Sequence, residues 1–213
     1  MIKQLSFFLI FVIVSGALFV SACNETVDPS PDKNQEIETE TPSAQYPLES
    51  VEVVFGFGRQ SSGFGGKHHT ADDYSGSGGT PVFAMADGRI SFSGPLGGYG
   101  WLITIDHFEL GVYSLYGHLS TERNKVTSGQ VKKGQLIAFL ADDDEDGSGP
   151  IDGGGNGYPY WPPHLHFGIR NGSVADYPSD GEGRWMAGYT IEDPITHGWL
   201  VPSEFIDMHS EPE

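Results

Sequence analysis

The chain has few of the features that anchor many functional predictions: one cysteine and only 11 lysine and arginine residues against 29 aspartate and glutamate residues. A single cysteine, Cys23, excludes a disulfide framework. The basic residues form no cluster that would neutralise phosphates and the formal net charge is −18, so we expect no nucleic-acid binding. The chain beyond residue 46 also lacks a long helical pattern, which argues against a helical fold.

The N-terminal residues 1–22 have the layout of a secretory signal, with an early lysine, an apolar run from Phe7 to about Val20 and then small residues. The run is too short and too poorly flanked for a membrane span. Its end, VSAC, resembles the bacterial lipobox, in which the cysteine is acylated and becomes the mature N-terminus. We therefore predict a lipoprotein signal and a lipid attached to Cys23, with an ordinary cleaved signal as the alternative.

Residues 24–46 are polar, acidic and dotted with proline. Such a segment buries too little apolar surface to offset the entropy lost on ordering. We predict a disordered tether over 23–46, one domain over 47–209 and a short tail over 210–213. About 160 residues suffice for a single domain with a hydrophobic core.

Short apolar runs separated by 30 glycines and 14 prolines make up the domain. Runs that alternate, or that are rich in β-branched and aromatic residues, are typical of strands. They are 50–57, 81–86, 89–94, 101–106, 112–117, 135–140 and 164–170. Residues 202–209 predict a short helix that the Ser203 hydroxyl caps. The predicted fold class is all-β, a single domain built on an antiparallel sheet with long loops.

Two histidines, His164 and His166, flank Leu165 in the last predicted strand. Side chains two apart in a strand share a face, so both imidazoles point the same way. This arrangement indicates a metal ligand, a catalytic base or one of each. A pair of partly exposed strand histidines is the alternative.

The stretch HHTADDY, residues 68–74, places histidines four residues from aspartates. Such a pair supplies a nitrogen and an oxygen to one metal ion, and catalytic zinc has three protein ligands plus water. On chemistry alone, either histidine and either aspartate suits the role.

The order of the motifs along the chain indicates which histidine and which aspartate bind the metal. HTADDY is followed by GTPVFAMADGRI, YGWLITIDH, YSLYGHLS, SGQVKKGQLIAFL and PPHLHFGI. This series, over about residues 55–170, resembles the lysostaphin-like, LytM-type zinc peptidases of the M23 family. The resemblance implies a β-rich domain with one zinc ion in a groove. By the family's spacing to GTPV, it implies three zinc ligands: His69, Asp73 and His166.

The same resemblance implies that His118 and His164 flank the metal without binding it. Zinc lowers the pKa of its bound water and polarises the scissile carbonyl, while a neutral histidine accepts a proton and a second donor stabilises the oxyanion. We expect His164 as the base and His118 as the oxyanion or leaving-group partner, although the two roles are exchangeable. The implied activity is that of a zinc metalloendopeptidase acting on peptide cross-links or bridges of bacterial peptidoglycan. A non-catalytic member that activates other wall hydrolases is the alternative.

Two segments depart from the family pattern. Asp72 puts a charge where an apolar residue is usual, so it either changes the local loop or adds a carboxylate behind the ligands. An acidic insertion precedes HLH, and its Asp142, Asp144 and Asp146 match the opening of a calcium loop over 142–153. The glutamate expected at the twelfth position of that loop is missing, and a solvated acidic loop is the alternative.

These features predict a lipid-anchored protein on the extracytoplasmic side of a bacterial membrane, in the cell envelope. Asn24 after the anchor favours the outer membrane where two membranes exist. We expect peptidoglycan peptides and the membrane as partners, and a monomer. His107 is expected in a turn or behind the ligands, and His68, His197 and His209 away from the site.

Overall fold

The computed structural model describes residues 41–142 and 162–211. The predicted signal, Cys23, most of the tether, and Asp144 and Asp146 lie outside the described residues. The described residues belong to one compact unit. Within the described part of the chain, no helix has the length and hydropathy needed to cross a bilayer.

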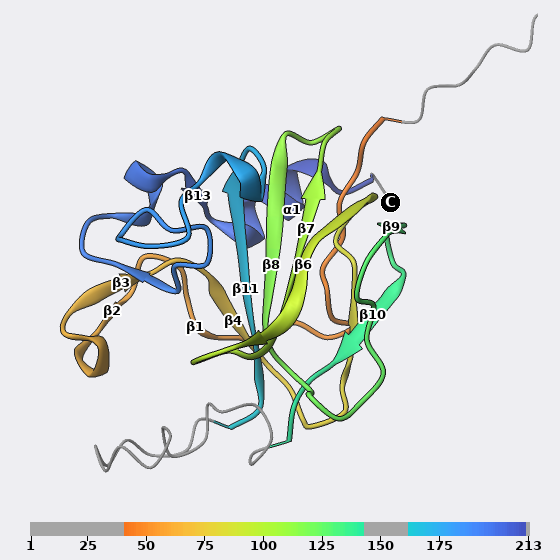
Figure 1. Ribbon diagram of the computed structural model, residues 1–213, viewed down its shortest axis with the longest axis horizontal. Helices are drawn as coiled ribbons and strands as arrows, with labels where there is room; N and C mark the ends of the chain where they lie inside the picture. Colours follow the sequence, from red (N-terminus) through yellow and green to blue (C-terminus); the bar gives the residue numbers. More distant parts are fainter. Residues whose placement is uncertain (1–40, 143–161, 212–213) are drawn as a thin grey trace, which may run out of the picture. The chain divides into compact units, whose positions relative to one another are not determined.

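An antiparallel sheet of eight strands forms the centre of this unit (Figure 1). Its strands lie in the order β1 (Val53–Phe55), β4 (Asp72–Ser75), β11 (His164–Asn171), β8 (Val112–Leu119), β7 (Gly100–His107), β6 (Gly88–Leu96) and β9 (Gln130–Val131), and β13 (Trp199–Leu200) also pairs with β11. The predicted all-β fold built on an antiparallel sheet is therefore confirmed.

Two smaller sheets and four short helices complete the described structure. One sheet pairs β5 (Pro81–Phe83) with β10 (Leu136–Phe139). The other, which we call the small sheet, has the order β12 (Tyr189–Thr190), β3 (Lys67–His69) and β2 (Gln60–Ser61). The helices are the 3-10 helices η1 (Ser62–Phe64), η3 (Val174–Asp176) and η4 (Pro194–His197), and the α-helix α1 (Pro202–His209). The helix predicted over 202–209 is present with these bounds.

The large sheet is covered on both faces, which explains why every residue of β8 is buried. Alternate residues of a strand point to opposite faces. In β11, Leu165, Phe167 and Ile169 pack in the main hydrophobic core. His164 and His166 therefore point to the other face, where a second cluster of Tyr99, Leu102, Tyr113, Leu115, Ala187 and Trp199 packs. The alternation in HLHFGI thus places its two histidines on the face of the sheet that residues 174–199 cover.

The C-terminal segment after β11 is attached to the sheet through Arg170, whose side chain is almost fully buried. Its guanidinium donates hydrogen bonds to the backbone oxygens of His197 at 2.8 Å, Arg184 at 3.0 Å and Gly183 at 3.2 Å. The same group lies 3.5 Å from the centre of the Tyr177 ring. Because a buried charge is stable only when its donors are satisfied, Arg170 fixes the path of residues 183–199 over the sheet.

The segment before β1 also packs against the domain. Ala44 is buried and its N–H donates to the His209 oxygen at 2.9 Å, while the Tyr46 hydroxyl donates to Asp207 at 2.8 Å. Residues shortly before the predicted boundary at 47 therefore contact α1.

Asp72 explains how α1 begins. Its carboxylate accepts the N–H of Phe57 at 2.9 Å and the N–H of Ser203, in the first turn of α1, at 3.3 Å. The expected cap by the Ser203 hydroxyl is wrong, because Val201 occupies the cap position and no side chain there bonds the helix. A carboxylate from a distant strand satisfies a first-turn donor of the helix instead.

Replacing Asp72 with alanine is expected to lower the free energy of unfolding by about 2 kcal/mol, because two backbone N–H groups lose their acceptor. Urea denaturation of the Asp72→Ala protein measures this change. The matched control is Glu49→Ala, which removes an exposed carboxylate and is expected to change stability by less than about 0.5 kcal/mol. Equal stability of the two variants would contradict the capping role.

Candidate metal centre and active site

The strand register lines up a row of side chains across one face of the large sheet. Asp73 on β4 lies opposite Phe55 on β1 and opposite His166 on β11, and His166 in turn lies opposite Gly117 on β8. Residues directly opposite in antiparallel strands share a face and lie close together. Phe55, Asp73 and His166 are therefore neighbours on the face opposite the main core.

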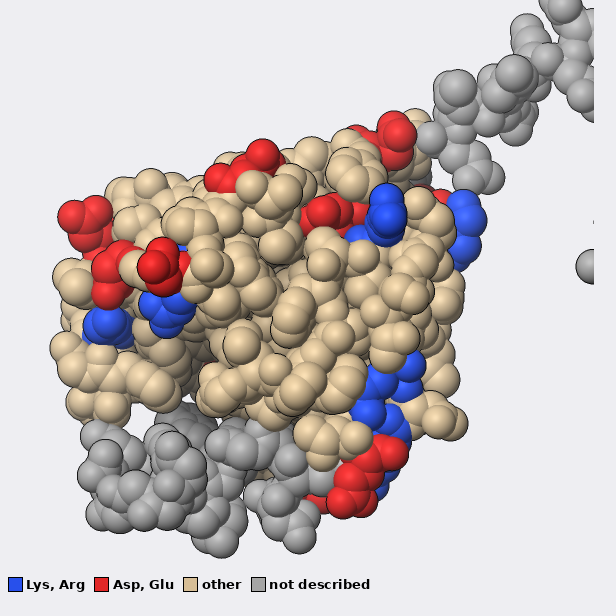
Figure 2. Space-filling model, in the orientation of Figure 1, with Lys and Arg blue, Asp and Glu red and all other residues tan. Residues whose placement is uncertain are grey.

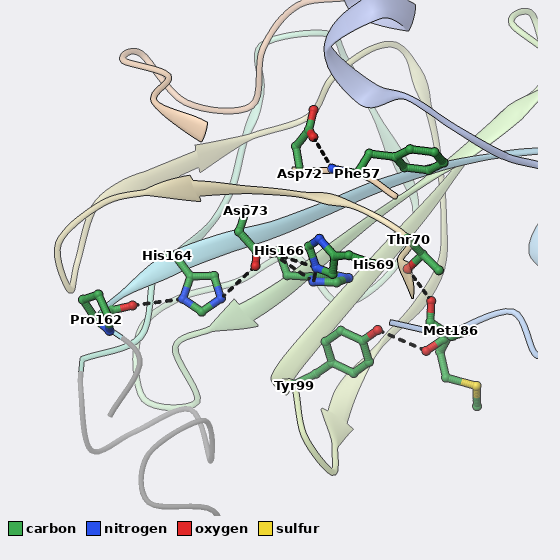
Figure 3. Close-up of polar contacts among 11 residues, drawn as sticks. Phe57, His69, Thr70, Asp72, Asp73, Tyr99, Pro162, His164, His166 and Met186 are labelled. Atoms are coloured by element: carbon green, nitrogen blue, oxygen red, sulfur yellow. Dashed lines mark hydrogen bonds and ion pairs between the residues drawn. The ribbon is translucent and has the colours of Figure 1, made fainter. Parts of the chain in front are cut away.

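His69 reaches the same place from β3 of the small sheet (Figure 3). Its Nε2 lies 3.0 Å from His166 Nδ1 and 3.3 Å from Asp73 Oδ1, and His166 Nδ1 lies 3.1 Å from Asp73 Oδ1. All three side chains are buried. The structure thus brings together the three residues that the motif order implied as metal ligands, although they are up to 97 positions apart.

The donor set fits a zinc ion. Tetrahedral zinc with ligands at about 2.0–2.2 Å separates neighbouring ligand atoms by about 3.3–3.6 Å, close to the three distances above. Two imidazole nitrogens and one carboxylate oxygen are also a usual ligand set of catalytic zinc. These three form the group of potential metal ligands found among the described residues.

The protonation states suit a cation at this point. Burial lowers the pKa of His166 to about 4, against the opposing effect of Asp73, so its imidazole is neutral at pH 7. Burial by itself would raise the pKa of Asp73, but His69 and His166 outweigh it and hold that pKa below its ordinary value. Metal binding needs a neutral imidazole and an ionised carboxylate.

His164 lies beside this cluster in a defined tautomer. Its Nδ1 is 2.9 Å from the Pro162 carbonyl oxygen, which only accepts hydrogen bonds, so Nδ1 carries the proton. Its Nε2 therefore presents a lone pair, and it lies 3.8 Å from Asp73 Oδ2. Pro162 thus sets which nitrogen of His164 faces the cluster (Figure 3).

His118, at the end of β8, has a φ of 61° and is the sole non-glycine residue with positive φ in the described ranges. This left-handed backbone costs about 1–2 kcal/mol for a residue with a side chain. Its N–H donates to the Tyr99 oxygen at 2.8 Å and its oxygen accepts from Ala141 at 3.1 Å, which hold the conformation in place. The ring centre lies 4.5 Å from that of His164, so the strained backbone places the two imidazoles together.

Tyr99 is a residue of the site that the sequence interpretation missed. Its ring centre lies 5.3 Å from that of His166 and 5.9 Å from that of His118, and its hydroxyl donates to the Met186 oxygen at 3.1 Å. A Cβ on Gly117 would lie 2.5 Å from the Tyr99 ring, so a glycine is needed there. The available signal was the tyrosine between glycines just before a predicted strand, but nothing local says that its ring turns toward HLH.

The other candidates lie away from the cluster. Asp72 points to the opposite face, as expected for a strand neighbour of Asp73, so it is not a carboxylate behind the ligands. His68 contacts the Gly58 oxygen at 3.0 Å. His107 is buried between the Asp87 oxygen at 2.8 Å and Ser114 Oγ at 2.7 Å, and burial lowers its pKa to about 4.

In the predicted calcium loop, Asp142 forms an ion pair with Arg123 at 2.6 Å, and the rest of the loop lies outside the described residues.

Residues 67–178, more than half of the chain, match the family model of peptidase family M23. The chain belongs to peptidase family M23. The matched range includes all five residues that the resemblance had implied for the site. Membership was thus correctly predicted from the order of the motifs.

The curated relatives of the chain carry names of three kinds. Over 102 residues the chain is 39% identical to the DD-carboxypeptidase/endopeptidase Mpg of Neisseria meningitidis, which covers 48% of the chain and 20% of Mpg. Over 106 residues it is 36% identical to the murein hydrolase activator EnvC of Escherichia coli, covering 50% of the chain and 22% of EnvC. It is 44% identical to the lipoprotein NlpD of Yersinia enterocolitica over 69 residues, 32% of the chain and 69% of NlpD. The chain thus spans about a fifth of the length of the first two of these relatives.

Among solved structures, lysostaphin of Staphylococcus simulans is similar in fold. The superposition has a TM-score of 0.55 at 21% identity and covers 81% of this chain and 56% of lysostaphin. At this identity the likeness concerns the fold, and it agrees with the predicted lysostaphin-like architecture.

Proposed function

We propose that this M23 protein is a zinc-dependent metalloendopeptidase that hydrolyses peptide cross-links or bridges of bacterial peptidoglycan. The observation that carries the proposal is the convergence of His69 Nε2, Asp73 Oδ1 and His166 Nδ1 on one point, next to two further histidines. His69, Asp73 and His166 would hold one zinc ion. When bound, zinc lowers the pKa of a coordinated water and polarises a carbonyl.

The two remaining histidines have separate tasks in this proposal. His164 accepts the proton of the attacking water at Nε2, because Pro162 keeps the proton of the imidazole on Nδ1. His118 stabilises the negative charge that develops on the carbonyl oxygen or protonates the leaving amine. Tyr99 positions both His118 and the segment around Met186 by its ring and its hydroxyl.

The relatives' names and the geometry of the site support the proposed substrate class. Mpg is named as a carboxypeptidase and endopeptidase and EnvC as an activator of murein hydrolases, so both names point to peptides of the cell wall. We propose the cell envelope as the location, with Cys23 acylated as a membrane anchor in the outer membrane where two membranes exist. NlpD, named a lipoprotein, agrees with that anchor. We further propose that the protein acts as a monomer and binds no nucleic acid.

A second candidate function is activation of other wall hydrolases without catalysis, which the 36% identity to EnvC favours. The described site argues against it, since a protein that only binds a hydrolase needs neither three converging ligand atoms nor a strained His118. The two functions differ in whether the isolated protein releases peptides.

Incubation of the purified protein with peptidoglycan separates the two functions. We expect soluble peptides to be released with new amino termini, release to stop after chelation, and zinc to restore it. Mass spectrometry of the products identifies the bond that is cut. Peptide release that appears solely when another hydrolase is added, and that does not respond to chelation, would establish the activator function instead.

A further inference from the structure

Arg59 lies directly across the small sheet from His69. The β2–β3 pair aligns Gln60 with His68, and the His69 N–H donates to the Arg59 oxygen at 3.0 Å. Opposite residues of an antiparallel pair share a face, so the side chains of Arg59 and His69 lie on the same side of the small sheet. Tyr189 on β12 lies opposite His69 on its other flank.

Aromatic rings connect these side chains into one wall beside the metal centre. The Phe55 ring is edge-on to His69 with centres 5.0 Å apart, and the Arg59 guanidinium lies 4.6 Å above the Phe55 ring. On the other flank, Tyr189 lies 5.0 Å from His69 and stacks on Phe64, which is 41% exposed, at 4.0 Å. Arg59 is itself exposed, so this wall presents both apolar surface and a cation to solvent.

The charge of Arg59 has no acidic partner in the described part of the chain. The ion pairs there take up Lys67, Arg123, Lys132 and Lys133, and Arg59 is in none of them. Basic side chains are scarce in this chain, and Figure 2 shows them in a few small groups on a face that is mostly uncharged. The guanidinium instead lies over the Phe55 ring, which adjoins the proposed metal ligand His69, and the residue is exposed.

We propose that Arg59 binds a carboxylate of the peptide substrate and thereby selects peptides with a free carboxylate close to the scissile bond. This inference rests on the proposed function and adds the substrate class. A planar guanidinium held on an aromatic ring is suited to bidentate recognition of a carboxylate. The adjoining rings of Phe55, Tyr189 and Phe64 supply apolar contact for the neighbouring peptide side chains.

The position of Arg59 limits where the carboxylate lies. One aromatic ring separates the guanidinium from His69, and an extended peptide spans about 3.4 Å per residue. A carboxylate about two or three residues from the cleaved bond therefore reaches Arg59 while the carbonyl lies at the metal. Cross-link peptides that end in a free carboxylate meet this requirement, and an uninterrupted glycine bridge offers no such group.

Two synthetic cross-link peptides, identical except for a terminal carboxylate or carboxamide, test the selection. With the zinc-loaded wild-type protein we expect kcat/KM to favour the carboxylate peptide by about 10–100-fold, the usual range for a charge-assisted hydrogen-bonded pair. Arg59→Gln is expected to bring the ratio close to one, chiefly through KM, and Arg59→Lys to leave an intermediate ratio. The control Arg89→Gln changes an exposed arginine on β6, which lies near the edge of the large sheet opposite β1. This variant should keep the wild-type ratio.

Calorimetric binding of both peptides to the wild-type and Arg59→Gln proteins gives a second readout that does not need turnover. A wild-type ratio near one, or a preference that survives Arg59→Gln in both assays, would overturn the role of Arg59 while leaving the peptidase intact. If neither peptide is cleaved but the carboxylate peptide binds in an Arg59-dependent way, the proposed hydrolysis fails and the carboxylate site stands.

Discussion

Replacing His118 or His164 with alanine is expected to lower kcat by about 10²–10⁴-fold while the protein still retains one zinc ion per chain. The reason is geometric: the two rings lie 4.5 Å apart beside the ligand cluster, yet neither belongs to the three converging donors. His164 has a proton fixed on Nδ1 by Pro162, which leaves Nε2 to accept one. Initial rates on a peptide substrate measure the first part of this prediction, and the zinc content by elemental mass spectrometry measures the second.

The matched control for these variants is His197→Ala, which removes a histidine side chain that lies in the C-terminal segment near Glu192. It should retain wild-type rates. Full activity in the His118→Ala or His164→Ala protein would contradict the catalytic assignment. Loss of zinc from either variant would instead make that histidine a ligand.

The asparagine variants of the neighbouring residues Asp73 and Asp72 are expected to differ strongly in zinc retention. Asp73→Asn is expected to reduce zinc from one ion per chain to less than about a tenth under dialysis, because loss of a direct ligand weakens affinity at least as much as the 10–100-fold seen for supporting residues. Asp72→Asn changes the same charge one position earlier and should retain zinc, since that carboxylate lies on the opposite face and caps α1.

Metal content after dialysis, with circular dichroism to show that both proteins fold, measures this contrast. Equal retention of zinc by the two variants would contradict the assignment of Asp73. Zinc loss confined to the Asp72→Asn protein would exchange the roles of the two aspartates, an alternative that the sequence by itself had left open.

The sequence predicted the long central strands of the large sheet well, because they are bounded by turn residues, but it missed β4, β9 and β13, which have two to four residues each. β7, β8 and β11 span eight residues each, and their alternation indicated which residues share a face. The small sheet was not predicted, because β2 and β12 are two residues long and carry no periodicity. It is held instead by tertiary contacts around His69.

The same limit applies to the site. HLH predicted correctly that His164 and His166 share a face, since period two is a property of the strand itself. Phe55, Tyr99 and Arg59 were missed as neighbours of the site, because their approach depends on strand register and on cross-strand pairing that no local pattern encodes. The left-handed backbone of His118 was not foreseen either, because positive φ is uncommon for any residue other than glycine and no local pattern marks this position.

The most direct test of the proposed zinc site is X-ray absorption at the zinc edge of the purified wild-type protein. The proposed ligand set predicts one zinc ion per chain, with the scattering of two imidazoles and a carboxylate oxygen, and loss of the zinc signal in the His166→Ala protein. A spectrum with oxygen ligands and no imidazole, or one that His166→Ala leaves unchanged, would contradict it.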